Sequence, residues 1–178
     1  MTEKAALIEK INRRDARVGV IGLGYVGLPL AVEFANAGFS VLGIDTDARK
    51  VAALNAGDSY VPDVPADVIG GLVAAGKLAA SQDYEAIAKL DAISICVPTP
   101  LRKTRDPDMS YVVSAAERIS EHLRPGMLIV LESTTYPGTT IEVVLPRMLS
   151  NGYTAGEDTF VAFSPERIDP ANPTYGVR

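Results

Sequence analysis

The chain has 178 residues, with 17 basic and 22 acidic side chains, a formal net charge of −5 and 47% hydrophobic residues. This size and composition are typical of one globular domain, and the acidic balance argues against binding to nucleic acid or a membrane surface. No apolar stretch approaches the length of a membrane span, residues 1–14 do not resemble a secretory signal, and a single cysteine excludes an internal disulfide. The sequence therefore predicts a cytoplasmic protein.

The first predicted element is a short amphipathic helix. Leu7, Ile8 and Ile11 recur at helical spacing. This pattern predicts a helical extension over residues 1–14 that packs on a main domain at 15–178.

The main domain begins with a strand that runs into a glycine-rich turn. An apolar run at 18–21 is followed by Gly22, Gly24 and Gly27 at G-x-G-x-x-G spacing. In the dinucleotide-binding βαβ unit, the first glycine turns the chain, the second lets a pyrophosphate approach the backbone, and the third lets the helix pack closely. Unpaired N–H groups at the start of that helix favour phosphate binding. The helix itself is predicted from the apolar positions Leu28, Ala31, Val32 and Ala35.

Asp45 closes the second predicted strand, at 39–45, and bears on the choice of cofactor. A carboxylate at this place accepts hydrogen bonds from the ribose hydroxyls of the adenosine and repels a 2′-phosphate. Arg49 and Lys50 follow closely and offer a site for a 2′-phosphate, or are simply solvated helix residues. The carboxylate argument favours NAD over NADP.

The remaining elements predict an α/β fold: a doubly wound (Rossmann), mostly parallel sheet with helices on both faces. Helices are predicted at 47–56 and 66–75, around 112–123, and from 138 to about 149 with a bend at Pro146. Further strands are predicted at 78–81, 92–97, 127–131 and 159–163.

Polar segments follow the carboxyl ends of these strands. Ligands of an open parallel sheet bind along that edge, so segments that are distant in sequence are expected to line one crevice. The segments are Gly22–Gly27, Asp45, Pro98–Thr99, Ser133–Thr134 and Ser164–Glu166.

Four strings together resemble the UDP-glucose/GDP-mannose 6-dehydrogenase family, over the chain from about Arg17 onward. They are Gly22-Leu-Gly-Tyr-Val-Gly27, Cys96-Val-Pro-Thr-Pro100, Glu132-Ser-Thr-Thr-Tyr-Pro-Gly138 and Ser164-Pro-Glu166. The chain is most similar to the UDP-N-acetylhexosamine branch in the strings Pro98–Arg102, Glu132–Thr140 and Phe163–Arg167, with UDP-N-acetylglucosamine as first choice of substrate. UDP-N-acetylmannosamine and UDP-glucose stay open as alternatives.

The resemblance implies oxidation of the C6 alcohol of a UDP-sugar to a carboxylate by two NAD+, in polysaccharide biosynthesis. A cysteine of the family captures the intermediate as a thiohemiacetal and then a thioester, which water hydrolyses. Thr134 matches the threonine that positions water or substrate near C6, and Glu166 matches the glutamate that acts in hydrolysis. The implied cofactor-binding set is Gly22, Leu23, Gly24, Tyr25, Val26, Gly27, Asp45, Lys50, Thr99, Ser133 and Thr134; no metal site is implied.

Thr134 and Glu166 also fit ordinary structural roles. Thr134 also fits a helix cap or turn hydroxyl, and Glu166 also fits a surface carboxylate beside Arg167. Cys96 lies within an apolar strand and is expected to be a buried hydrophobe rather than the nucleophile.

The family's nucleophilic cysteine belongs to a later Gly-x-Cys segment. The resemblance implies that this chain lacks that segment, the central helix and the C-terminal substrate domain. The chain alone is therefore expected to bind NAD without turnover, while the full-length parent is expected to be a homodimer.

Two alternatives remain open at this point. A stand-alone NAD-sensing regulatory module would carry the same fold, since fold alone does not fix function. A β-hydroxyacid dehydrogenase shares the cofactor half, but it lacks the strings at 133–138 and 164–166.

Overall fold

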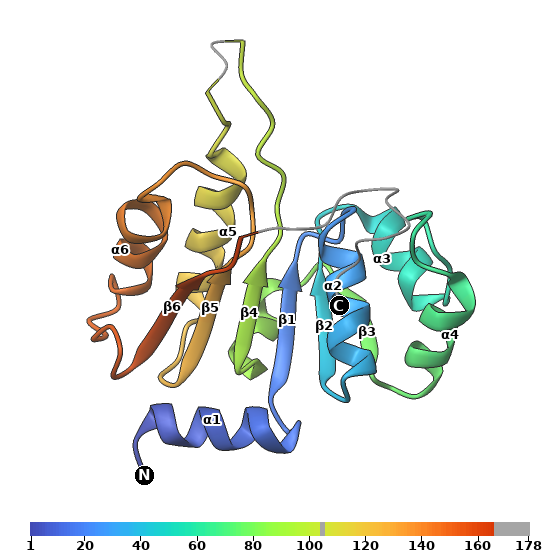
Figure 1. Ribbon diagram of the computed structural model, residues 1–178, viewed down its shortest axis with the longest axis horizontal. Coiled ribbons are helices and arrows are strands. Elements are labelled where there is room, and N and C mark those ends of the chain that lie inside the picture. Colours follow the sequence, from blue (N-terminus) through green and yellow to red (C-terminus); the bar gives the residue numbers. More distant parts are fainter. Residues whose placement is uncertain (104–105, 166–178) are drawn as a thin grey trace.

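The structure is a computed structural model that describes residues 1–103 and 106–165. Its centre is a parallel sheet in the order β3-β2-β1-β4-β5-β6 (Figure 1). The chain runs outward from the centre to β3, returns beside β1 with β4, and continues outward to β6. This arrangement confirms the predicted doubly wound fold. The strands are β1 (Arg17–Ile21), β2 (Ser40–Ile44), β3 (Leu78–Ser81), β4 (Ala92–Ile95), β5 (Met127–Leu131) and β6 (Thr159–Phe163).

Helices connect successive strands and cover both faces of the sheet. The α-helices are α1 (Glu3–Arg13), α2 (Gly27–Asn36), α3 (Ala48–Asn55), α4 (Ala66–Ala74), α5 (Ser110–Glu121) and α6 (Leu145–Met148). A short 3-10 helix spans Tyr84–Lys89, and a π-helical turn spans Thr140–Val144.

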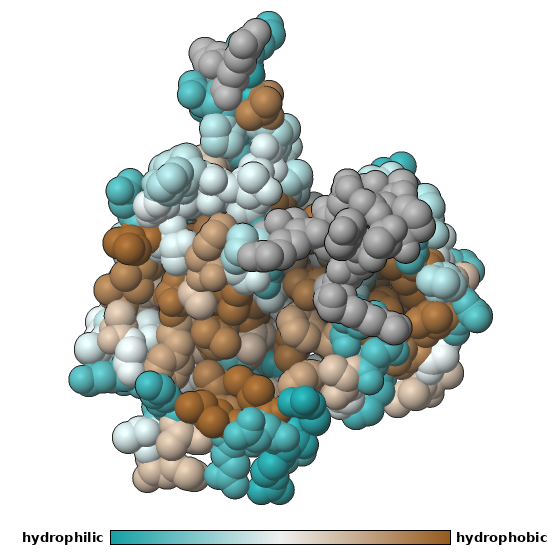
Figure 2. All heavy atoms as spheres, viewed as in Figure 1, coloured by the Kyte–Doolittle hydropathy of each residue, from teal (hydrophilic) through white to brown (hydrophobic). Residues whose placement is uncertain are grey.

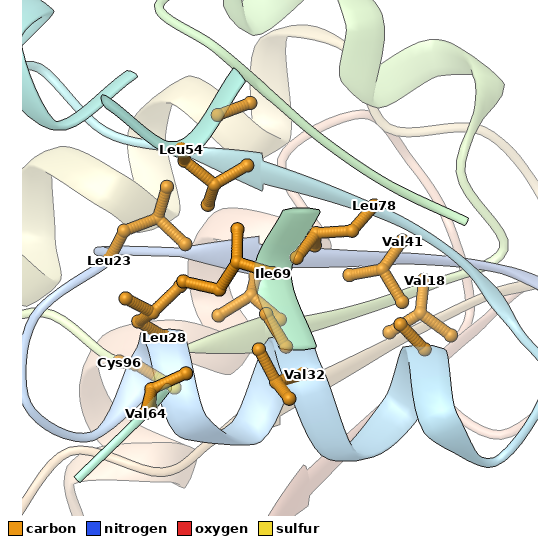
Figure 3. Close-up of a cluster of buried hydrophobic side chains, with 14 of the residues drawn as sticks. Val18, Leu23, Leu28, Val32, Val41, Leu54, Val64, Ile69, Leu78 and Cys96 are labelled. Atoms are coloured by element: carbon orange, nitrogen blue, oxygen red, sulfur yellow. The ribbon is translucent and has the colours of Figure 1, made fainter. Parts of the chain in front are cut away.

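The two faces bury two separate apolar clusters. On one face, the side chains of α2 and α4 pack against β1, β2 and β3, and Figure 3 shows Leu28, Val32 and Ile69 among them. On the other face, Ile119 of α5 packs with Ile129 of β5 and other buried residues of β4 and β5. Because both faces are covered, the central strands are almost continuously apolar, which is why their sequences show runs rather than alternation.

The last predicted helix is divided at Pro146. Proline has no backbone N–H, so the carbonyl of Glu142 has no partner at the usual spacing within the helix. The chain forms the π-helical turn first and continues as α6, with Pro146 in the first turn of that helix. Nη1 of Arg147 donates a hydrogen bond of 2.7 Å to the carbonyl of Val143 at this junction.

The predicted N-terminal helix is present as α1 and lies across the amino-terminal edge of the sheet (Figure 1). Figure 2 shows its hydrophilic residues facing away from the body and apolar residues between it and the sheet. Asp91 accepts hydrogen bonds from Lys10 Nζ, Arg124 Nη2 and the backbone N–H of Arg17, at 2.8 to 2.9 Å. Burial opposes the charged form, but these donors outweigh it and lower the pKa of Asp91. The opposite edge, where the strands end, stays clear of α1.

No helix in the two described ranges combines the length and the apolar character needed to cross a lipid bilayer.

Candidate functional site

A cavity of about 570 Å³ opens at the carboxyl ends of β1, β2, β4 and β5. This is the point at which the strand order reverses, because β1 lies between β2 and β4. Open parallel sheets bind their ligands at this topological switch point. The predicted site residues in its lining are Gly22, Gly24, Tyr25, Val26, Asp45, Lys50, Thr99, Ser133 and Thr134.

The glycine turn between β1 and α2 has the tight geometry that its spacing predicts. Gly22 has a φ of +91°, in the left-handed region that favours glycine. A Cβ placed on Gly27 would overlap the carbonyl oxygen of Gly22 and lie 3.1 Å from the Cβ of Cys96. The turn therefore closes tightly on itself above β4.

Gly24 faces open space in the cavity, where a Cβ would meet no atom within 4 Å. The backbone N–H groups of Gly24, Tyr25 and Val26 donate to no acceptor among the described residues. Three such donors just before α2, beside the positive end of its dipole, are groups of the kind that bind an anion such as a pyrophosphate.

Asp45 lies directly after β2 and is 8% exposed. Its Oδ2 accepts from the backbone N–H of Leu23 at 2.8 Å and from Lys50 Nζ at 3.1 Å, and its Oδ1 accepts from the N–H of Asp47 at 2.9 Å. A carboxylate oxygen accepts two hydrogen bonds, so Oδ1 retains capacity for a ribose hydroxyl. Asp45 thus both braces the glycine turn and presents an acceptor to the cavity.

Asp47 and Arg49 form a second charged group next to Asp45. The side chain and backbone N–H of Arg49 donate to Asp47, which lowers the pKa of that half-buried carboxyl to about 2. Asp47 therefore stays ionised, and Arg49 is already engaged at a distance of 2.9 Å. This ion pair weakens the case for Arg49 as the partner of a 2′-phosphate.

The loops that follow β4 and β5 meet on the other side of the cavity. The Thr99 hydroxyl donates to the carbonyl of Thr134 at 2.7 Å, and the buried Ser133 hydroxyl donates to the carbonyl of Val97 at 2.8 Å. Thr134 itself is exposed, and its hydroxyl makes no hydrogen bond to another described residue. Thr99 and Ser133 therefore fix the two loops together, while Thr134 is exposed at the lining of the cavity.

Two of the implied residues have a different place. The side chain of Leu23 is fully buried in the first apolar cluster, so only its peptide groups take part in the turn (Figure 3). Gly27 shapes the turn without lining the cavity. Glu166, the second implied catalytic residue, lies outside the described residues.

The cavity is also lined by residues that the sequence analysis did not single out. They include Tyr84 from the 3-10 helix, Tyr111 from the first turn of α5, and Thr46 and Ser114. Burial foremost raises the pKa of Tyr84, which keeps its hydroxyl protonated. The sequence could have indicated Tyr111 and Ser114 only through the topology of the sheet. The first turn of α5 follows β4 and so lies at the same edge as the glycine turn.

Cys96 is buried beneath the glycine turn, in accordance with its prediction as a core residue.

Across residues 1–103 and 106–165, no group of three or more histidine, cysteine, aspartate or glutamate residues is arranged to hold a metal ion. The described lining of the site combines backbone donors, hydroxyls, the carboxylates of Asp45, Asp47 and Glu132 and the ammonium group of Lys50. Such a set suits a phosphate-bearing organic cofactor.

Comparison with known proteins agrees with this geometry. Residues 16–178 match the model of the UDP-glucose/GDP-mannose dehydrogenase family, NAD binding domain. The chain is 36% identical to UDP-N-acetyl-D-glucosamine 6-dehydrogenase of Pseudomonas aeruginosa, over 92% of this chain and 38% of that protein. It is 39% identical to UDP-N-acetyl-D-mannosamine dehydrogenase of Escherichia coli K12, over 87% of this chain and 38% of that protein.

The fold is also similar to that of solved dehydrogenase structures. NDP-N-acetyl-D-galactosaminuronic acid dehydrogenase from Methanosarcina mazei superposes with a TM-score of 0.83 at 34% identity, over 96% of this chain and 38% of that chain. A ternary complex of GDP-mannose dehydrogenase from Pseudomonas aeruginosa superposes with a TM-score of 0.82 at 30% identity, over 87% of this chain and 37% of that chain.

The chain thus spans less than two fifths of the length of these relatives. The relatives are dehydrogenases, so they give no support to the alternative of a regulatory module, and the family match decides against a β-hydroxyacid dehydrogenase. The glycine turn, the carboxylate after β2 and the match over residues 16–178 lead to one conclusion: this chain belongs to the UDP-glucose/GDP-mannose dehydrogenase family, as its NAD-binding domain.

Proposed function

We propose that this domain holds NAD in a parent protein that oxidises the C6 alcohol of a UDP-N-acetylhexosamine to the carboxylate. The observation that carries the proposal is the meeting of three segments around one cavity: the glycine turn, Asp45 and the loop with Thr134. The names of the relatives, which include UDP-N-acetyl-D-glucosamine and UDP-N-acetyl-D-mannosamine dehydrogenases, support the class of substrate.

The chain's own groups suggest how the cofactor would lie. The free N–H groups at the start of α2 would bind the pyrophosphate, and Asp45 with Lys50 would bind the adenosine ribose. The loops with Thr99, Ser133 and Thr134 would then border the nicotinamide, which accepts the hydride. Two NAD+ and one water convert each alcohol to a carboxylate, with release of two NADH and three protons.

Thr134 and Glu166 are the catalytic residues of this proposal. A threonine hydroxyl both donates and accepts, so Thr134 can hold the attacking water or the substrate oxygen. Glu166 is proposed as the acid/base group of hydrolysis on the family resemblance alone. A homodimeric parent and a cytoplasmic location belong to the same proposal, supported by that resemblance and by the sequence composition.

The test uses the full-length parent with UDP-N-acetylglucosamine, and counts NADH per sugar. Unmodified protein is expected to form two NADH for each sugar consumed. Thr134→Ala and Glu166→Gln are each expected to reduce kcat by about 100-fold, in the range for loss of one acid–base or positioning group, with NAD affinity nearly unchanged. Ser150→Ala, which removes a hydroxyl outside the cavity, serves as the control. Unchanged turnover in both site variants would remove these two residues from the mechanism.

A further inference from the structure

We propose that Tyr60 is a positioning residue for the cofactor's pyrophosphate, because its hydroxyl fixes the direction of the Gly24 N–H group. This inference rests on the proposed NAD pocket. Tyr60 lies in the loop between α3 and α4, and it does not line the cavity. It therefore acts through the glycine turn and not by touching the ligand.

Tyr60 acts on the peptide unit that joins Leu23 to Gly24. The Tyr60 hydroxyl donates to the Leu23 carbonyl oxygen at 3.0 Å. In a trans peptide the C=O and N–H of one unit point in opposite directions, and the described chain contains no cis peptide. Holding the Leu23 carbonyl therefore also sets the direction of the Gly24 N–H, one of the free donors at the start of α2.

The neighbouring peptide unit is held in a matching way. The N–H of Leu23 donates to Oδ2 of Asp45 at 2.8 Å. Two consecutive peptide units of the turn are thus each fixed by one side chain, Asp45 on one and Tyr60 on the other. Glycine has few conformational restrictions of its own, so these outside contacts decide how Gly24 presents its N–H.

The loop that carries Tyr60 is itself firmly held. Val61 and Val64 are 3% and 5% exposed and belong to the first apolar cluster, where Figure 3 shows Val64 beside Leu28 and Cys96. The Ser59 hydroxyl donates to the carbonyl of Val61 at 3.0 Å. Tyr60 therefore approaches the turn from an anchored segment, which is what a positioning residue requires.

The chemistry of the phenol suits a permanent donor. Burial foremost, then the charges of Asp45 and Asp47, raise the pKa of Tyr60 above its ordinary value. The hydroxyl stays protonated across the physiological range, so its hydrogen bond to Leu23 does not titrate there.

The test is Tyr60→Phe in the 178-residue chain, with Tyr153→Phe as a matched control. Tyr153 also donates to a backbone carbonyl, that of Leu123 at 3.3 Å, but outside the cavity. Calorimetry is expected to show a three- to tenfold weaker affinity for NAD in Tyr60→Phe, about what one hydrogen bond contributes, and no change in the control. The affinity for ADP, which also carries the diphosphate, is expected to fall by the same factor.

A second readout separates positioning from general stability. In ¹H–¹⁵N spectra, the Gly24 amide resonance is expected to move in Tyr60→Phe and to respond less to NAD, while the control leaves it in place. Affinity within twofold of the unmodified chain, or an equal loss in both variants, would overturn the proposal. Failure of the unmodified chain to bind NAD would contradict the cofactor pocket, and this inference with it.

Discussion

Gly27→Ala is expected to abolish measurable NAD binding and to lower the free energy of unfolding by about 3 kcal/mol, at the upper end for overpacked sites. The added Cβ would overlap the carbonyl oxygen of Gly22 and crowd Cys96. Neither neighbour can move freely, because one is backbone in a left-handed turn and the other is buried. The turn would have to open, and the free N–H groups at the start of α2 would lose their common direction. Urea unfolding and calorimetry with NAD measure the two effects.

Gly71→Ala is the matched control for this change. Gly71 lies within α4, and a Cβ there would meet no atom within 4 Å. Alanine has a higher helix propensity than glycine. This variant is therefore expected to be more stable by about 0.5–1 kcal/mol and to bind NAD normally. If Gly27→Ala bound NAD as well as Gly71→Ala does, the close approach at the turn would have no part in cofactor binding.

Asp45→Ala is expected to weaken NAD binding by about 10- to 100-fold, since hydrogen bonds to a charged acceptor contribute about 1.5–3 kcal/mol. The change removes the ribose acceptor and also releases the Leu23 N–H, which Asp45 holds at 2.8 Å. It leaves Lys50 without its ion-pair partner, so binding of NADP should suffer less than binding of NAD. Calorimetric titration of both cofactors against both proteins measures this change of preference.

Asp83→Ala is the control for the carboxylate. Asp83 also accepts a local backbone N–H, that of Glu85 at 2.8 Å, but it does not line the cavity. Its removal is expected to leave both affinities unchanged. Equal affinity of the unmodified chain for NAD and NADP would contradict the selective role of Asp45.

The sheet was predictable because its signals are local. Each central strand is an apolar run that ends at a polar or glycine-rich segment, and each α-helix from α2 to α5 shows a buried face at helical spacing. Since parallel strands end at one edge, the meeting of the glycine turn, Asp45 and Thr134 at one cavity also followed from the predicted parallel sheet.

The remaining features depend on contacts between distant segments. The sequence predicted Asp45 as an acceptor for ribose hydroxyls but not its contacts within the protein, where Leu23, Lys50 and Asp47 donate to it. Tyr60 and Tyr84 lie in segments without a regular pattern, and their relation to the site arises only when loops pack against the sheet. The π-helical turn before Pro146 was likewise not predictable from the sequence. A proline predicts that a helix is interrupted, but only the backbone conformation shows which form the interruption takes.

We expect the dinucleotide to bind along the carboxyl ends of the strands. A titration of the ¹⁵N-labelled chain with NAD, followed by amide resonances, tests this placement. Amides of Gly22–Val26, Asp45 and the loops at Thr99 and Thr134 are expected to shift, while those of α1 and Asp91 at the opposite edge stay in place. Shifts confined to the α1 edge, or a glycine turn that does not respond to saturating NAD, would contradict it.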